Sequence, residues 1–171
     1  MLFSGKFIRS NIEGDATMLH IVLIVIHALM ELICLAIGTW LVYQIPHRED
    51  QRFQVYLGAL VLMFIFLIVA ILTDWMRITT TMRVIFSGLA LLALYMVFRG
   101  FQARQTLRQQ GADWQLHFID DMGFTLISLF DGFAIVSVFD LHSPPWLIAL
   151  IAVAGVVVGV TLLHSVKRRL A

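Results

Sequence analysis

The feature that most constrains this chain is a series of long apolar stretches separated by short polar segments. A helix needs about 20 apolar residues to cross the hydrocarbon core of a bilayer. Five stretches approach or exceed that length, at residues 18–45, 53–73, 82–98, 118–139 and 146–166. Hydrophobic residues make up 60% of the chain and charged residues only 13%, far from the balance of a soluble domain. The sequence therefore predicts an all-α fold, a polytopic membrane helix bundle with five transmembrane helices.

The basic residues predict how the bundle is oriented. With five spans, one side of the membrane holds Lys6, Arg9, Arg77 and Arg83, whereas the other holds Arg48, Arg52, Arg99, Arg104, Arg108, Lys167, Arg168 and Arg169. Basic residues concentrate on the cytoplasmic side. We therefore expect the N-terminus outside, the C-terminus in the cytoplasm, and a multi-pass protein of the plasma (cytoplasmic) membrane of a prokaryote.

This orientation divides the chain into segments. Residues 1–17 form an extracytoplasmic segment, which fits either an interfacial amphipathic helix or a frayed terminus. Residues 18–166 form a single transmembrane domain. Within it, residues 99–117 form a cytoplasmic loop, into which the third helix can continue until Gly111 breaks it. Residues 167–171 form a basic cytoplasmic tail.

The fourth stretch carries an aspartate, Asp131, at its centre. A central aspartate costs about 2.5–3.5 kcal/mol on insertion scales, and the surrounding apolar residues offset that cost. Two strands would leave backbone edges unpaired in lipid, so we predict a spanning helix. The stretch contains two near-copies of one phrase, Gly123–Asp131 and Gly132–Asp140. These copies fall on opposite helix faces and define no functional stripe, because nine residues rotate the chain by a half-turn beyond two full turns.

Polar residues of the first stretch share one narrow helix face, which contains His20, His27, Glu31 and Cys34 and continues to Gly38. Such a face is too polar for lipid and must look into the bundle. His27 and Glu31 are spaced i, i+4 and can touch.

Two carboxyls are expected at similar depth, because Glu31 lies near the middle of the first span and Asp131 near the middle of the fourth. Two carboxylates in that position cannot both ionise cheaply unless His27 or a cation compensates. Intramembrane acids of this kind indicate a functional site. The simplest alternative is that they hydrogen-bond between helices and fix the packing.

Three kinds of site fit these residues. A proton or cation relay would use Glu31, His27 and Asp131, with His20 and Asp140 at the outer mouth and Asp120 and Asp121 at the inner one. A metal site would draw on His27, Glu31 and Cys34. A haem would need two histidines at one depth, for which His20 with His142 and His117 with His164 are candidates.

The fifth stretch contains Ala152, Gly155 and Gly159, a pattern of small residues that lets helix backbones approach closely. We expect that contact inside the bundle rather than between protomers. Asp120 and Asp121 are neighbours that point about 100° apart, which does not suit shared catalysis, and they fit instead the acidic N-terminal turn of the fourth helix.

Other features exclude several classes of function. The net charge of +1 gives no basic footprint for nucleic acid, and the single cysteine, Cys34, excludes an intrachain disulfide. The sequence has no Gly-rich phosphate loop, no G-x-S-x-G and no H-E-x-x-H.

We therefore predict a non-enzymatic accessory or assembly subunit of a membrane complex, without a cofactor. Its partners would be the bilayer and either further copies of the chain or a larger membrane complex. The alternative is a proton- or cation-coupled transporter or channel that uses Glu31 and Asp131, and a third option is a haem- or metal-binding membrane protein.

Overall fold

The computed structural model describes residues 3–45, 51–76, 78–140 and 145–168. Within these ranges the side chains of residues 3–17, 19–21, 136–140, 145 and 148–149 are not described. The elements are α1 (Phe3–Tyr43), α2 (Gln51–Asp74), α3 (Thr80–Gln109), α4 (Trp114–Asp140) and α5 (Pro145–Arg168). No strand occurs in the described ranges, so the predicted all-α fold is confirmed.

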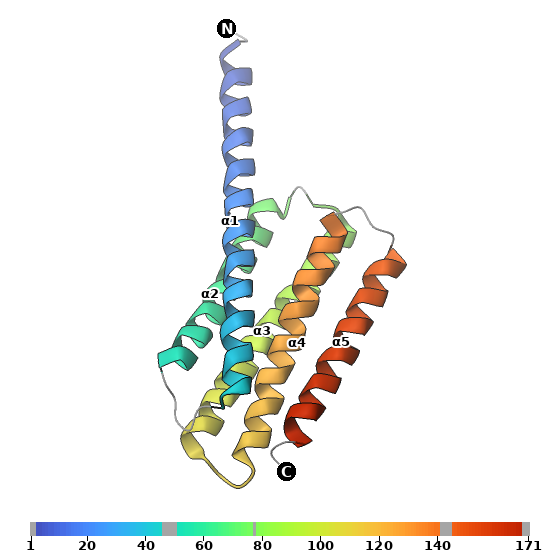
Figure 1. Cartoon of the computed structure of the whole chain (residues 1–171). Helices are drawn as coiled ribbons and strands as arrows, with labels where there is room; N and C mark the ends of the chain where they lie inside the picture. Colours follow the sequence, from blue (N-terminus) through green and yellow to red (C-terminus); the bar gives the residue numbers. More distant parts are fainter. Residues whose placement is uncertain (1–2, 46–50, 77, 141–144, 169–171) are drawn as a thin grey trace.

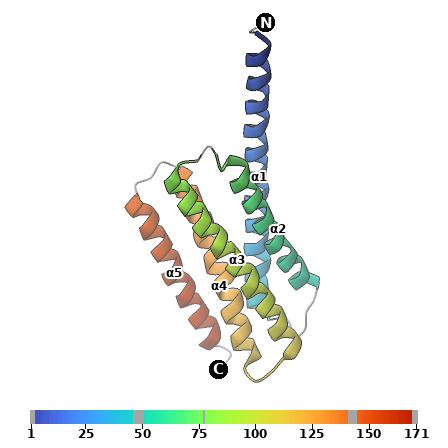
Figure 2. The same cartoon turned by 180° about the vertical axis from the view of Figure 1, so that it is seen from behind.

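Four of the helices form a closed ring, and the fifth lies outside it. Helix α1 packs against α2, α2 against α3, α3 against α4, and α4 against α1. Helix α5 packs on α4 and lies at the edge of the bundle (Figures 1 and 2). Helix α4 therefore has three helical neighbours and occupies the centre of the arrangement.

The core lies inside the ring and is mainly apolar. Its fully buried side chains include Cys34, Phe53, Tyr56, Leu60, Ala103, Phe118, Ile119, Met122 and Thr125. The aromatic rings of Phe53 and Phe118 lie 6.1 Å apart between α2 and α4. Burial of this many large side chains is the main force that holds the ring together.

The outward faces of the helices are also apolar. Large hydrophobic side chains with at least two fifths of their surface exposed occur on every helix, and on α5 they include Leu150, Val153, Val156, Val157, Val158, Val160 and Leu162. In the part of the chain that is described, four helical segments are long and apolar enough to cross a membrane, namely Val22–Tyr43, Gln51–Asp74, Thr80–Gln109 and Leu150–Arg168. An apolar surface of this extent fits a lipid environment.

Helix α4, the predicted fourth span, is not among these four segments. Its described side chains include Asp120, Asp121 and Asp131, which place three acids within a window of spanning length. The structure therefore supports a membrane helix bundle with four candidate spans among the described residues.

Two boundaries differ from the expected ones. Helix α1 begins at Phe3 instead of residue 18, and its N-terminal half projects beyond the other helices (Figure 1). The expected loop 99–117 is mostly helical, because α3 continues to Gln109 and α4 begins at Trp114. The predicted continuation of the third helix is thus confirmed, although its backbone turns at Gln110, in the left-handed region with φ 44°, rather than at Gly111.

Two glycines of α5, Gly155 and Gly159, lie against α4 within the chain. A Cβ at Gly155 would meet the carboxylate of Asp131, and a Cβ at Gly159 would overlap the side chain of Ile127. Ala152, one turn before Gly155, is half-buried. The absence of side chains at the two glycines lets α5 approach the side chains of α4.

We predict that Gly159→Ala destabilises the protein by about 1–3 kcal/mol, the usual cost of overpacking. The new methyl group would overlap Ile127, whose β-branched side chain has few alternative rotamers. The matched control is Gly88→Ala in α3, where a Cβ meets nothing within 4 Å. Unfolding free energies of the two variants should differ when they are measured by circular dichroism in mixed micelles with an increasing fraction of denaturing detergent. Equal values would show that α5 does not pack on α4 as described.

Candidate functional site within the helix bundle

Helix α4 carries a column of buried polar side chains on one side. Asp121, Thr125, Ser128 and Asp131 are all buried, and they follow one another at intervals of three or four residues. This spacing places them on successive turns of the helix. Sequence analysis selected the acids but missed Thr125 and Ser128, although hydroxyl side chains at helical spacing between two acids are a readable signal.

A buried hydrogen bond ties this column to α2. The hydroxyl oxygens of Tyr56 and Thr125 lie 2.7 Å apart. Thr125 also lies 2.8 Å from the backbone carbonyl of Met122, to which it donates. Because a threonine hydroxyl has a single proton to donate, the Tyr56 hydroxyl is the donor in the bond between the two side chains. Both groups are thereby satisfied in the interior of the ring.

Helix α1 joins the same region through two small residues. The Cys34 thiol lies 3.9 Å from the backbone carbonyl of Tyr56, at the limit of a weak sulfur hydrogen bond. At Gly38 a Cβ would crowd both the Tyr56 ring and the Leu126 side chain. The predicted polar face of α1 therefore does look into the bundle over Cys34 and Gly38, where it packs against α2 and α4.

Glu31 lies in the seam between α1 and α4. Its side chain is only 8% exposed, and its Oε1 atom lies 3.3 Å from the position that a Cβ would take on Gly132. The glutamate thus rests on a part of α4 that carries no side chain. No hydrogen bond from the Glu31 carboxyl to another described side chain is present.

His27 has its own partner on a different helix. Its Nδ1 atom lies 3.1 Å from the backbone carbonyl of Met63 in α2. Because a carbonyl only accepts, this contact requires the proton on Nδ1. His27 is therefore oriented by α2, and within the described residues no bond joins it to Glu31 one turn away.

Asp131 lies in the other seam, between α4 and α5. Its Oδ1 atom is buried without a hydrogen-bond partner among the described residues, and its carboxylate faces Gly155. Buried polar atoms are rarely left unpaired, because an unmade hydrogen bond costs about 1–3 kcal/mol. Among the described residues, Asp131 provides the one buried carboxyl oxygen of this kind, beside the Nε atoms of Arg83 and Arg99.

The two acids share a level but face different seams. Glu31 packs on Gly132, the residue that follows Asp131, so both carboxyls lie at the same height along α4. Consecutive residues of a helix point about 100° apart. Glu31 and Asp131 accordingly occupy adjacent sides of α4, and no hydrogen bond between them is present among the described residues.

Two ion pairs lie near the N-terminal end of α4. Arg99 of α3 lies 3.1 Å from the Asp121 carboxylate, and its guanidinium also lies 5.6 Å from the centre of the Phe124 ring. Lys167 of α5 pairs with Asp120. The neighbouring aspartates thus hold α3 and α5 on two sides of α4. The sequence analysis placed these aspartates in the acidic N-terminal turn of the helix. That expectation is wrong, because the helix begins earlier, at Trp114.

The residues predicted for metal or haem are not gathered into one site within the described part of the chain. No three His, Cys, Asp or Glu side chains lie close enough there to hold a metal ion. The side chains of His20 and Asp140, as well as His142, lie outside the described residues. His117 and His164 are both exposed.

Comparison of the chain with protein-family models, with curated proteins and with solved structures found no match in any of the three. The function must therefore be argued from the geometry of the buried polar groups.

We predict that Tyr56→Phe lowers the unfolding free energy by about 0.5–1.5 kcal/mol, the net worth of one hydrogen bond. The reason is that the ring can stay in place while the bond to Thr125 is lost. Tyr43→Phe is the matched control, since Tyr43 is 79% exposed. Detergent-titration unfolding measures both, and a loss as small as that of Tyr43→Phe would contradict the buried bond.

The neighbouring aspartates provide a second matched pair. Asp121→Asn should cost about 1.5–3 kcal/mol, because it weakens a charged hydrogen bond that is largely shielded from solvent. Asp120→Asn should cost less than about 1 kcal/mol, since the Asp120 side chain is 49% exposed. The same unfolding assay tests this order. The reverse order would place the wrong aspartate at the α3 interface.

Proposed function

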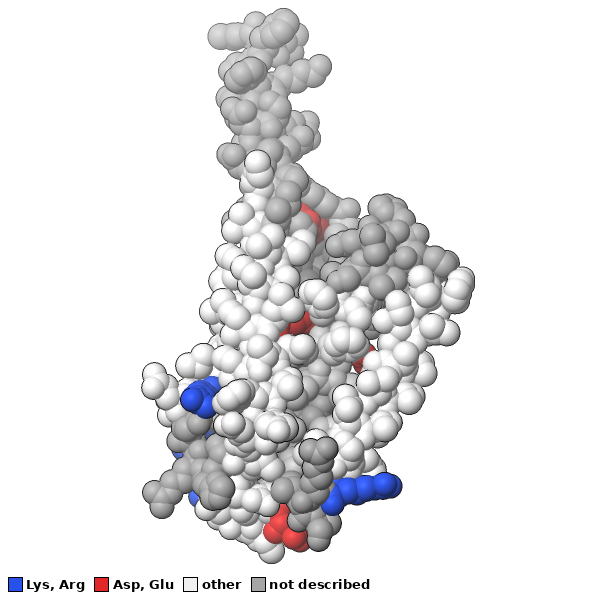
Figure 3. All heavy atoms as spheres, viewed as in Figure 1, with Lys and Arg blue, Asp and Glu red and all other residues white. Residues whose placement is uncertain are grey.

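We propose that this chain is a plasma-membrane protein whose five helices all cross the bilayer, with the N-terminus outside and the C-terminus in the cytoplasm. The apolar outward faces of the bundle support this proposal. On the face shown in Figure 3, Lys and Arg gather toward one end of the molecule, as the positive-inside rule requires of a cytoplasmic end.

The burial of its acids supports the inclusion of α4. Asp121 is paired with Arg99, and Asp120 is paired with Lys167 near the end of the bundle. Asp131 is covered by α5 and turned away from lipid. The cost of inserting α4 is therefore reduced by its three neighbours, since intramembrane acids are tolerated where they face the bundle interior.

We further propose that the bundle exchanges protons across the membrane, with Asp131 and Glu31 as the groups that bind and release them. The observation that carries this proposal is the buried Oδ1 atom of Asp131, which lacks a partner. A buried carboxyl oxygen that makes no hydrogen bond does not help to hold the helices together. It is suited to a proton that arrives and leaves.

The column on α4 supplies a route toward the cytoplasmic end. Thr125 and Ser128 lie between Asp121 and Asp131, one turn apart from their neighbours. Hydroxyl groups both donate and accept hydrogen bonds, so a water molecule beside Ser128 can carry a proton to or from the carboxyls on the neighbouring turns, whereas the Thr125 hydroxyl is engaged by Tyr56 and by the Met122 carbonyl. Glu31 lies at the level of Asp131 and provides a second carboxyl at the same depth.

The accessory-subunit function predicted from the sequence remains the second candidate. The N-terminal half of α1 projects beyond the bundle (Figure 1), and such a helix is suited to reach another protein. The buried acids, however, lie between helices of one chain, whereas acids that serve assembly with a partner would face outward. Their position favours proton exchange.

Proton flux into liposomes tests this function. We expect phosphatidylcholine proteoliposomes with a trapped pH dye to acidify faster than protein-free liposomes when a potassium diffusion potential, negative inside, is imposed. Asp131→Asn and Glu31→Gln should each reduce the rate to that of protein-free liposomes, because an amide cannot take up and release the proton.

Asp120→Asn is the matched control, since Asp120 is exposed and lies outside the column. It should keep the parent rate, and unfolding curves should show that all three variants fold. Flux that is indistinguishable from that of protein-free liposomes in the parent, or unchanged in both carboxyl variants, would reject proton exchange and leave the accessory-subunit function.

A further inference from the structure

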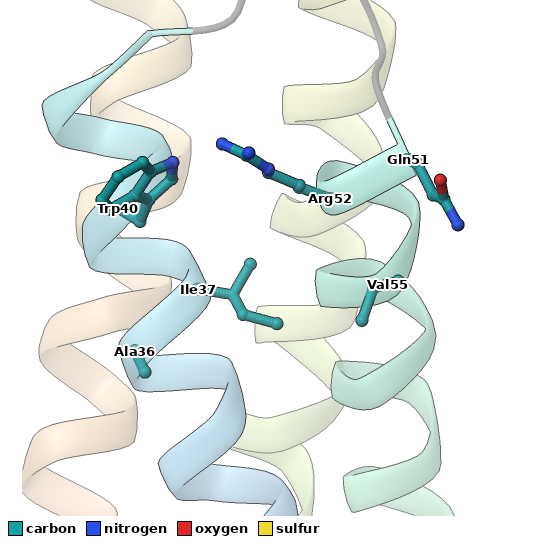
Figure 4. A pocket seen from close by; sticks show the side chains of 6 residues that line it. All are labelled: Ala36, Ile37, Trp40, Gln51, Arg52 and Val55. Atoms are coloured by element: carbon teal, nitrogen blue, oxygen red, sulfur yellow. The ribbon is translucent and has the colours of Figure 1, made fainter.

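A shallow groove runs along the seam between α1 and α2, close to the end where α1 finishes and α2 begins. It has a volume of about 690 Å³ and is lined by Ala36, Ile37, Trp40, Gln51, Arg52 and Val55. Figure 4 shows that the Trp40 ring and the Arg52 side chain face each other across this groove, whereas Gln51 points away from it. Deeper along the seam, the walls are apolar.

Arg52 supplies the one strong charge of the groove. Its guanidinium lies 5.5 Å from the centre of the Trp40 ring, a cation–π contact that holds it over the groove. No carboxylate of a described residue pairs with it, in contrast to Arg99 and Lys167, which are bound to Asp121 and Asp120. The planar fork of donors of a guanidinium matches the geometry of a phosphate.

The position of this charge matches the headgroup level of a bilayer. Trp40 lies three residues before the end of α1 and Arg52 is the second residue of α2. Tryptophan and arginine near span ends occupy the membrane interface. Ile37 and Val55 lie about one turn deeper, where an acyl chain would run.

We propose that this groove is a binding site for an anionic phospholipid of the cytoplasmic leaflet. The phosphate pairs with the Arg52 guanidinium beside Trp40, and an acyl chain covers Ile37 and Val55. A soluble anion would leave the apolar walls uncovered, and a zwitterionic lipid would bring a second cation to Arg52, so charge and apolarity together select this ligand. The proposal rests on the proposed crossing of the bilayer by α1 and α2, and not on proton exchange.

Quenching of Trp40 fluorescence by brominated lipid tests the site. Trp75, Trp114 and Trp146 are replaced by Phe so that Trp40 is the only tryptophan. This protein is reconstituted in phosphatidylcholine vesicles that contain equal small fractions of brominated phosphatidylglycerol or brominated phosphatidylcholine. We expect roughly fivefold stronger association of the brominated phosphatidylglycerol, the preference that one basic residue near the surface gives.

Arg52→Gln should abolish this preference, and Arg52→Lys should retain much of it, because the ammonium keeps the charge. Arg168→Gln is the matched control: Arg168 is an exposed basic residue at the end of α5, and its loss should leave the preference intact. Circular dichroism should show that the variants keep their helices. Equal quenching by the two brominated lipids, or a preference that survives Arg52→Gln, would overturn the site. Absence of quenching by either lipid would instead overturn the proposed crossing of the bilayer, and with it the site.

Discussion

The constraint on which this structure depends is that a helix bearing acids must be covered by other helices before it can lie among apolar ones. Helix α4 is that helix. It packs against three others, α1, α3 and α5, whereas each of the other helices has at most two large interfaces. Asp121 is met by Arg99 of α3, and Asp120 by Lys167 of α5. The closed ring and the attached fifth helix are thus two ways of shielding the polar groups of one element from the surroundings.

Glycine makes this shielding possible at mid-depth. Glu31 rests on Gly132 and Asp131 faces Gly155, so each carboxyl is opposed by a residue that has no side chain. The same absence of side chains lets the helices approach closely enough for dispersion contacts to replace those with solvent or lipid. Each acid is therefore enclosed by backbone and apolar groups, and the Oδ1 atom of Asp131 is left without a partner.

The helices could be predicted from the sequence because apolar length is a local property, and five apolar stretches became five helices. The extension of α3 to Gln109 was also readable, since neither proline nor glycine occurs between Phe101 and Gln110. Depth was readable in part: Glu31 does lie at the level of Asp131. The sequence did not predict which residues meet across each seam, because these contacts depend on how each helix is rotated and on which helices are adjacent.

The missed residues illustrate that limit. The sequence analysis gives Tyr56 no role. It is instead fully buried and bonded to Thr125. His27 and Glu31 are one turn apart and can touch, but the hydrogen bond of His27 goes to the Met63 carbonyl of α2. Local spacing identifies side chains that can meet, whereas tertiary packing decides which of them do.

The two mid-depth acids differ in how their seams can open. The Glu31 seam belongs to the closed ring, where separation of α1 from α4 also disturbs the packing of α1 on α2. The Asp131 seam lies between α4 and α5, and α5 packs mainly on that one neighbour. Movement of α5 therefore disrupts a single interface. Under the proposed function, Asp131 is the carboxyl whose access to water changes with the position of α5, and Glu31 is the fixed carboxyl beside it.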